Sequence, residues 1–298
     1  VFQASTATDT TPTDQTKRRD VTKIIWLASF PKSGNTWTRI FLMNLFMNPS
    51  EPLPINEVYQ MSPSDVALEW YRMVDPRPPE SWTVADYAQM RPRVQEKIAS
   101  HAPDSIFVKT HSPLSPWHGV PAFNMQVTAG AICIVRNPLD VVASYASHSG
   151  LDLDPMIEIM QRPDYAAPGG EERAPHPIGS WSQNVASWTA RGHQAMHVMR
   201  YEDMVEKPLE AFGGLVAFLR LPPDEGRLKK ALEFSSFQEL KGQESSGGFD
   251  EASKKAQQFF RGGKTGGWKK ELTKAQVKAV VDAHRPQMER FGYVPDGY

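Results

Sequence analysis

The segment Lys23–Met47 constrains the fold most strongly, because it joins an apolar run to an apolar helix through a very short polar loop. It reads KIIWLASFPKSGNTWTRIFLMNLFM. Ile24–Ala28 is typical of a buried strand, Ser29–Asn35 contains the turn formers Pro, Gly and Asn, and Thr36–Met47 is apolar enough to pack into a core. The N–H groups of such a loop and of the first helical turn point at one place, where the helix dipole adds partial positive charge. The sequence therefore predicts a phosphate-like anion site at the end of the first strand.

The polar side chains of this loop strengthen the prediction. Lys32 adds a full positive charge, and Ser33 and Thr36 add hydroxyl groups. The loop is not a Walker A motif, in which a glycine and four residues precede Gly-Lys-Ser/Thr; here Lys32 comes before Gly34 and the loop is shorter. Taken alone, the loop is also compatible with an ordinary strand–helix turn that carries a solvated lysine.

A second predicted strand, Ser105–Thr110, ends in the triplet Lys-Thr-His at 109–111. Because ligands bind at the carboxyl ends of parallel strands, we expect Lys109 and His111 to lie beside Lys32. A histidine titrates near neutral pH and suits a general base. The alternative is a structural or surface histidine, since the sequence contains eight of them.

A third predicted strand, Ala131–Val135, leads into RNPLDVVAS. The Asn-Pro pair suits an N-cap and a first helical position, which places Arg136 at the strand end and Ser144 two turns into the next helix. Arginine forms forked, charge-assisted hydrogen bonds with phosphate. A salt bridge from Arg136 to Asp140 is the alternative.

These motifs resemble those of the PAPS-dependent sulfotransferases, where PAPS is 3′-phosphoadenosine-5′-phosphosulfate. FPKSGNTW at 30–37 resembles the family's 5′-phosphosulfate loop, and KTH resembles the segment that carries the catalytic base. Arg136–Ser144 resembles the 3′-phosphate segment. RYED at 200–203, SSFQELK at 235–241 and RGGKTGGWK at 261–269 follow in the family's order. The resemblance covers most of the chain, from Lys23 to Phe291.

The resemblance implies transfer of a sulfuryl group from PAPS to a hydroxyl or amine of a small-molecule acceptor, with release of PAP. It implies that His111 accepts the acceptor's proton, that Lys32 stabilises the leaving group, and that Lys109 contacts the sulfuryl oxygens. The cofactor-binding residues that it implies are Lys32, Ser33, Gly34, Asn35 and Thr36 for the 5′-phosphate, Trp37, Tyr201, Ser235 and Phe237 for the adenine, and Arg136, Ser144, Arg261, Gly262 and Gly263 for the 3′-phosphate.

Two departures from the family pattern fall in the last motif. Gly262 stands where a lysine is expected and Gly267 where an aspartate is expected, although Lys264 is available to replace the lysine. The family's C-terminal dimer segment is also poorly matched, because Lys274 and Lys278 occupy its valine and glutamate positions. We infer no dimer from it, and the oligomeric state stays open.

The predicted fold is α/β: a single domain with a central parallel β-sheet flanked by helices, similar to P-loop nucleotide kinases. We expect residues 21–298 to form this domain and residues 1–20 to form a mobile tail, because the tail is polar and lacks the apolar core of a signal peptide. Two proline-rich segments, 48–77 and 149–179, are expected to be irregular, and either could form the acceptor pocket.

The amino-acid composition limits the classes of partner and the cellular compartment that we expect for this protein. A formal net charge of −1 gives no indication of a nucleic-acid surface, and no run approaches the roughly 20 apolar residues of a membrane helix. A single cysteine excludes a disulfide within the chain and favours a reducing compartment, which we expect to be the cytoplasm. The histidines lack metal-ligand spacing, so no metal is expected. The competing interpretations are a nucleotide or small-molecule kinase of similar fold and a non-catalytic PAPS- or PAP-binding protein.

Overall fold

A computed structural model describes residues 23–253 and 258–298 of the chain, so the predicted tail at 1–20 lies outside the described residues. A central sheet runs in the order β2–β1–β3–β6, with every pair parallel. Its strands are β1 (Ile24–Ser29), β2 (Ile106–Thr110), β3 (Thr128–Val135) and β6 (Met196–Arg200). The predicted fold class is therefore confirmed, and the three strands predicted above coincide with β1, β2 and β3.

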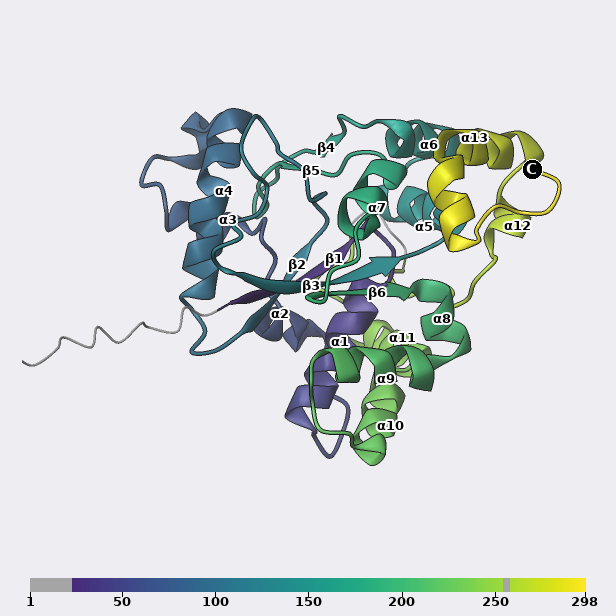
Figure 1. Cartoon of the computed structure of the whole chain (residues 1–298), viewed down its shortest axis with the longest axis horizontal. Helices are drawn as coiled ribbons and strands as arrows, with labels where there is room; N and C mark the ends of the chain where they lie inside the picture. The colour runs from purple at the N-terminus through teal and green to yellow at the C-terminus, as the bar shows by residue number, and fades with distance from the viewer. Residues whose placement is uncertain (1–22, 254–257) are drawn as a thin grey trace, which may run out of the picture.

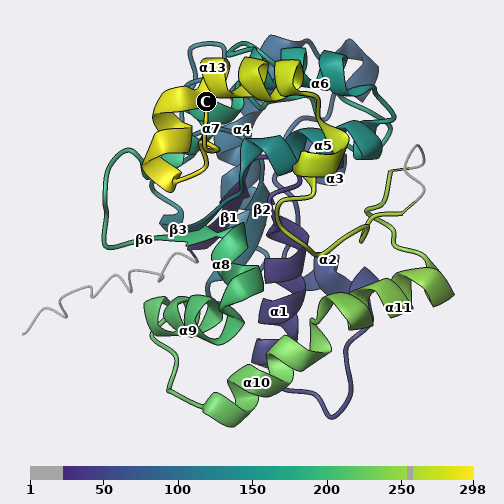
Figure 2. The ribbon, with the colours of Figure 1, turned by 90° about the vertical axis from the view of Figure 1, so that its right-hand side faces the viewer.

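Helices cover both faces of the sheet (Figure 1). On one face lie α1 (Asn35–Met47), α8 (Tyr201–Glu206), α9 (Pro208–Phe218), α10 (Glu225–Phe234) and α11 (Phe237–Gly247). On the other lie α5 (Pro138–Ser149), α6 (Leu153–Gln161), α7 (Trp181–Thr189) and α13 (Lys274–Phe291). The view turned by 90° shows the same two layers above and below the strands (Figure 2).

Shorter elements complete the chain near the edges of the sheet. They are η1 (Ile55–Glu57), α2 (Val58–Met61), α3 (Leu68–Arg72), η2 (Pro79–Ser81), the longer α4 (Val84–Ala99), α12 (Trp268–Glu271) and the antiparallel pair β4 (Ala166–Ala167) and β5 (His176–Pro177). No helix within the described ranges is both long and apolar enough to cross a bilayer.

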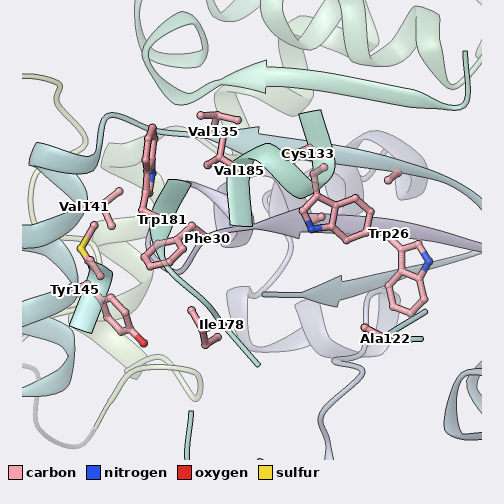
Figure 3. Packing of buried hydrophobic residues seen from close by; sticks show 14 of the residues in the cluster. Trp26, Phe30, Ala122, Cys133, Val135, Val141, Tyr145, Ile178, Trp181 and Val185 are labelled. Carbon is pink, nitrogen blue, oxygen red and sulfur yellow. The ribbon is translucent and has the colours of Figure 1, made fainter. Parts of the chain in front are cut away.

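Alternate residues of β1 pack into two separate hydrophobic cores, because successive side chains of a strand point to opposite faces of the sheet. Trp26 and Ala28 join the core under α7, whereas Leu27 joins the core under α1 and α9. Figure 3 shows the first core, with Trp181 and Val185 of α7 packed over the sheet. Trp181 and Trp188 of α7 are thus both core residues.

One predicted irregular segment is more ordered than expected. Residues 149–179 contain α6 and the β4–β5 pair, whereas 48–77 holds only short turns of helix. The one proline within α6, Pro155, lies in the first turn, where a backbone N–H has no helical acceptor and proline is tolerated. The expectation that 149–179 is irregular is therefore wrong for Leu153–Gln161.

Candidate active site

The loop between β1 and α1 is held in an uncommon backbone conformation. Lys32 has φ of 65° and Gly34 has φ of 106°, both in the left-handed region. A Cβ atom on Gly34 would lie 2.8 Å from the Tyr201 ring, so this position also needs glycine for space. Gly34 is the N-cap of α1 and supplies no side-chain cap, so the first N–H groups of the helix are available to a ligand.

The loop is anchored from below by a buried amide. Asn35 Nδ2 donates to the Leu27 carbonyl oxygen at 2.8 Å and to Ser29 Oγ at 3.3 Å. Ser33 Oγ, Trp37 Nε1 and Arg136 Nε are buried polar atoms without a hydrogen-bond partner among the described residues. Buried polar groups are nearly always satisfied. A hydroxyl and a guanidinium N–H left unpaired at a helix N-terminus therefore fit an anionic ligand.

His111 follows β2 directly and reaches across to β1. Its Nδ1 atom lies 2.8 Å from the Ser29 carbonyl oxygen and 3.3 Å from Ser29 Oγ. Because a carbonyl only accepts, Nδ1 carries the proton and Nε2 keeps its lone pair. Burial, with the positive charge of Lys109, holds the pKa of His111 well below its usual value of 6.5. The imidazole is therefore neutral at pH 7 and able to accept a proton.

A buried ion pair forms hydrogen bonds with the two residues next to His111 in the chain, Thr110 and Ser112. Arg91 of α4 donates to Asp65 at 2.7 Å and to Ser112 Oγ at 3.1 Å, and Thr110 Oγ1 donates to Asp65 at 3.2 Å. Both charged side chains are 1% exposed. On the far side, Asn184 of α7 donates to the His111 carbonyl at 2.8 Å. The base is thus held by β1, α4 and α7 together.

The Lys32 ammonium group is largely buried and is surrounded by other positively charged side chains. Burial, together with the charges of Lys109 and Arg136, lowers the pKa of Lys32 to about 7. Its ammonium nitrogen lies 3.6 Å from the centre of the Phe259 ring, a cation–π contact. A positively charged pocket of this kind favours binding of an anion, which would restore the lysine to its charged form.

Lys109 forms an ion pair that the sequence does not predict. Its Nζ donates to Glu251 Oε2 at 2.8 Å, and Arg39 Nη1 contacts both oxygens of the same carboxylate at 2.7 and 2.9 Å. Burial works to raise the pKa of Glu251, but the charges of Lys109 and Arg39 outweigh it and hold that pKa below its usual range. Burial lowers the pKa of Lys109 in spite of the carboxylate.

The predicted 3′-phosphate residues lie around the same loop. Arg136 Nη1 donates to the Lys32 carbonyl at 2.8 Å, and its guanidinium stacks 4.2 Å from the Tyr201 ring centre. Arg261 Nη1 donates to the Ala143 carbonyl at 3.2 Å, next to Ser144 in the chain. Its other contact is an exposed pair with Glu271 at 3.3 Å. Arg136 therefore contacts the loop between β1 and α1, and Arg261 contacts α5 at the residue before Ser144.

The predicted adenine residues gather beside them. The Trp37 and Tyr201 rings are 6.0 Å apart in an edge contact. Ser235 is fully buried, and its hydroxyl donates to the Ala231 carbonyl. The Phe237 ring packs on Gly263, where a Cβ would lie 2.4 Å away, so the glycine is needed for this contact.

The two departures from the family pattern have simple structural settings. A Cβ on Gly262 would have only Lys264 N nearby, at 4.0 Å. The space that the family's lysine would occupy is therefore not filled by other side chains next to Gly262. The backbone at Gly267 is shaped instead by Asp140, whose oxygens accept from Gly266 N at 2.8 Å and Trp268 N at 3.0 Å. The carboxylate of Asp140 thus orders this loop and makes no ion pair with Arg136, contrary to the alternative considered for that arginine.

Sequence reasoning missed Arg39, Glu251, Phe259 and Asn184. Arg39 alone carried a signal, as a charge within an otherwise apolar helix, and it is fully buried. Glu251 and Phe259 lie in a segment without periodicity, and nothing in the sequence connects them to residues far earlier in the chain. Within residues 23–253 and 258–298, no three His, Cys, Asp or Glu side chains are grouped to hold a metal ion.

Comparison with known proteins identifies the family. The family model described as "Sulfotransferase domain" matches residues 22–292. Rat sulfotransferase 2A6 (Rattus norvegicus) is 25% identical over 277 residues, which cover 89% of this chain and 84% of the relative. The mouse (Mus musculus) sulfotransferase 1 family member D1 is 25% identical over 273 residues, which cover 89% and 83%.

Solved structures share the fold. Retinol dehydratase in complex with retinol and PAP superposes with a TM-score of 0.62 at 19% identity, covering 89% of this chain and 81% of that one. Mouse sulfotransferase SULT7A1 complexed with PAP gives 0.55 at 19% identity, covering 89% and 84%.

Proposed function

The chain belongs to the sulfotransferase domain family, and from this premise we propose that it transfers a sulfuryl group from PAPS to a hydroxyl or amine of a small-molecule acceptor and releases PAP. One observation carries the proposal. A neutral histidine with a free Nε2 lies at the strand ends that carry two partly buried lysines, near a helix N-terminus where a hydroxyl and a guanidinium N–H lack partners among the described residues.

His111 is the general base in this proposal. The hydrogen bond from Nδ1 to Ser29 fixes the tautomer, and the Arg91–Asp65 pair fixes the strand end that carries the ring. Nε2 then takes the proton of the acceptor as the acceptor oxygen or nitrogen attacks sulfur. Because burial keeps the imidazole neutral, the base is in its working form at neutral pH.

Two lysines stabilise the charge that moves during transfer. As the bond between sulfur and the bridging oxygen breaks, negative charge develops on the 5′-phosphate, and Lys32 and the N–H groups of residues 33–36 are placed to receive it. Lys109 is assigned to the sulfuryl oxygens. Prearranged charges of this kind are the largest contribution in related group transfers, where in-line positioning does most of the remaining work.

The remaining predicted residues recognise the nucleotide. Arg136, Ser144 and Arg261 are assigned to the 3′-phosphate, with the backbone of Gly262 and Gly263 beside them. Trp37, Tyr201, Ser235 and Phe237 are assigned to the adenine. The open space at Gly262 supports a 3′-phosphate contact from the backbone or from Lys264 in place of the family's lysine.

We keep three broader assignments as proposals. Residues 21–298 act as one sulfotransferase domain, the partner is a small-molecule acceptor with no nucleic acid or membrane partner, and the compartment is the cytoplasm. The compartment is supported by the sequence's single cysteine, Cys133, which is a buried free thiol.

The test is turnover with PAPS and a panel of small phenols, alcohols and amines, measured as PAP release. Sulfation of one panel class, lost in the variant H111A, is the expected result. Phosphoryl transfer from ATP with magnesium in place of sulfation would support the kinase alternative. PAP binding without turnover of any acceptor class would support the non-catalytic alternative.

A further inference from the structure

Glu251 contacts the same ammonium group that the proposed reaction assigns to the sulfuryl oxygens. Lys109 Nζ and Glu251 Oε2 are 2.8 Å apart. Both side chains are about one-fifth exposed, at 19% and 21%. An ion pair that is largely removed from water is strong enough to affect what else can bind there.

Arg39 holds the same carboxylate from the other side and is itself fixed. Its Nε donates to Ser62 Oγ and its Nη2 to the Ser62 carbonyl oxygen, both at 2.8 Å. Its Nη1 contacts both oxygens of Glu251. The guanidinium is fully buried, so Glu251 can release Lys109 and still keep a forked partner.

The same stretch of chain also contacts the second catalytic lysine. The Phe259 ring covers the Lys32 ammonium, and Glu244 accepts the N–H groups of Phe259 and Phe260 at 2.5 and 2.9 Å. Among the described residues after α11, Glu251 and Phe259 thus both contact lysines assigned to sulfuryl transfer.

We propose that Glu251 is a specificity-determining residue that sets the affinity of the site for the sulfuryl-bearing donor relative to the desulfated product. The inference rests on the proposed function. A sulfuryl group and a carboxylate are both negative, and both require Lys109. PAPS must therefore displace Glu251 from Lys109 toward Arg39, whereas PAP, which has no sulfuryl group, leaves the pair intact.

The two partners of the carboxylate predict opposite effects. Glu251→Gln removes the competing charge, so the ratio of PAPS affinity to PAP affinity rises by about tenfold. Arg39→Gln removes the group that receives Glu251 after displacement, so the carboxylate stays on Lys109 and the ratio falls. Loosening of this part of the chain would instead move both variants in one direction.

The experiment is calorimetric titration of the full chain with PAPS and with PAP, without acceptor, for the wild type, E251Q, R39Q and E244Q. Glu244 holds the backbone at 259–260, and its charge acts on Lys32, which is assigned to the 5′-phosphate that PAPS and PAP share. E244Q therefore controls for loosening and should change both affinities alike, which keeps the wild-type ratio. Thermal unfolding checks that each variant is folded. Because E251Q leaves the buried Arg39 charge unpaired, R39Q carries the test alone should E251Q not fold.

The outcomes separate this inference from the proposed function. A ratio that rises in E251Q and falls in R39Q supports the role of Glu251. A ratio unchanged in both, or shifted equally in E244Q, overturns it while PAP and PAPS still bind. Failure of the wild type to bind either nucleotide overturns the proposed function itself.

Discussion

The Nδ1 atom of His111 lies 2.8 Å from the carbonyl oxygen of Ser29 and links the ends of two neighbouring strands. Register pairs Ala28 of β1 with Thr110 of β2, which leaves the next residue of each strand at the same edge of the sheet. The contact therefore follows from the topology, and it decides which ring nitrogen is free to act as a base.

Replacing His111 by alanine should lower kcat by about 100-fold or more while the affinity for PAP stays within about twofold, because a general base contributes roughly 10²–10⁴-fold. Stopped assays of PAP release and calorimetry with PAP measure the two quantities. The control is H193A, in the exposed turn before β6 at the opposite end of the parallel sheet. A normal kcat in H111A would disprove the assignment of the base.

The pH profile gives a second test of His111. Because the pKa of His111 is held well below 6.5, the base is protonated only in acid. The acid limb of kcat/KM should therefore lie below pH 6.5. A limb centred at 6.5 or above would show that an ordinary exposed histidine is the base.

Lys32 should couple nucleotide binding to proton uptake. With a pKa of about 7 it is mostly neutral at pH 8, and an adjacent phosphate raises that pKa, so binding takes up about one proton. Titration with PAP at pH 8 in buffers of different ionisation enthalpy measures the uptake, which should disappear in K32M. Equal uptake in the variant and the wild type would contradict this account.

Arg136→Ala should weaken PAP by about tenfold to a hundredfold, since a charge-assisted hydrogen bond contributes about 1.5–3 kcal/mol. Adenosine 5′-phosphate, which lacks the 3′-phosphate, should lose much less. R285A, an exposed pair with Glu289 on α13, serves as the matched control. Equal weakening of both nucleotides would remove Arg136 from the 3′-phosphate site.

The Arg91–Asp65 pair should matter for stability. Arg91→Met leaves a fully buried carboxylate without its partner, and breaking such a pair costs about 3–5 kcal/mol of unfolding free energy. Urea unfolding measures the loss. The comparable variant R162M, in an exposed pair with Asp164, should cost less than about 1 kcal/mol. A loss below about 1 kcal/mol in R91M would mean that the pair does not brace the strand end.

Much of the site follows from local sequence rules. Lys32, Lys109 and Arg136 could be placed together because each lies at or just beyond the carboxyl end of a predicted strand, and parallel strands end at one edge. Helix signals were equally local: Asn137 accepts from Leu139 N, and Pro138 opens α5, as the Asn-Pro pair predicts. The fold class needed only these strands and their connecting helices.

The parts that sequence could not supply depend on contacts between distant segments. Glu251 lies 142 residues beyond Lys109, in a stretch with no periodic pattern, so no local sequence pattern predicts the ion pair. The hydrogen bond from Thr110 Oγ1 to Asp65 likewise joins a strand to a proline-rich segment far from it in the chain, so no local pattern predicts it. The helix at Leu153–Gln161 was missed because the segment 149–179 as a whole is rich in proline, although these prolines leave the helix intact: Pro155 lies in its first turn, where proline is tolerated.

The central claim is that this site recognises a nucleotide with a 3′-phosphate. Calorimetric titration with PAP, and with ADP as the control, tests it most directly. We expect PAP to bind at least about tenfold more tightly than ADP, because only PAP can use Arg136, Ser144 and Arg261. ADP binding as tight as PAP, or tighter, would contradict the account and favour the kinase alternative.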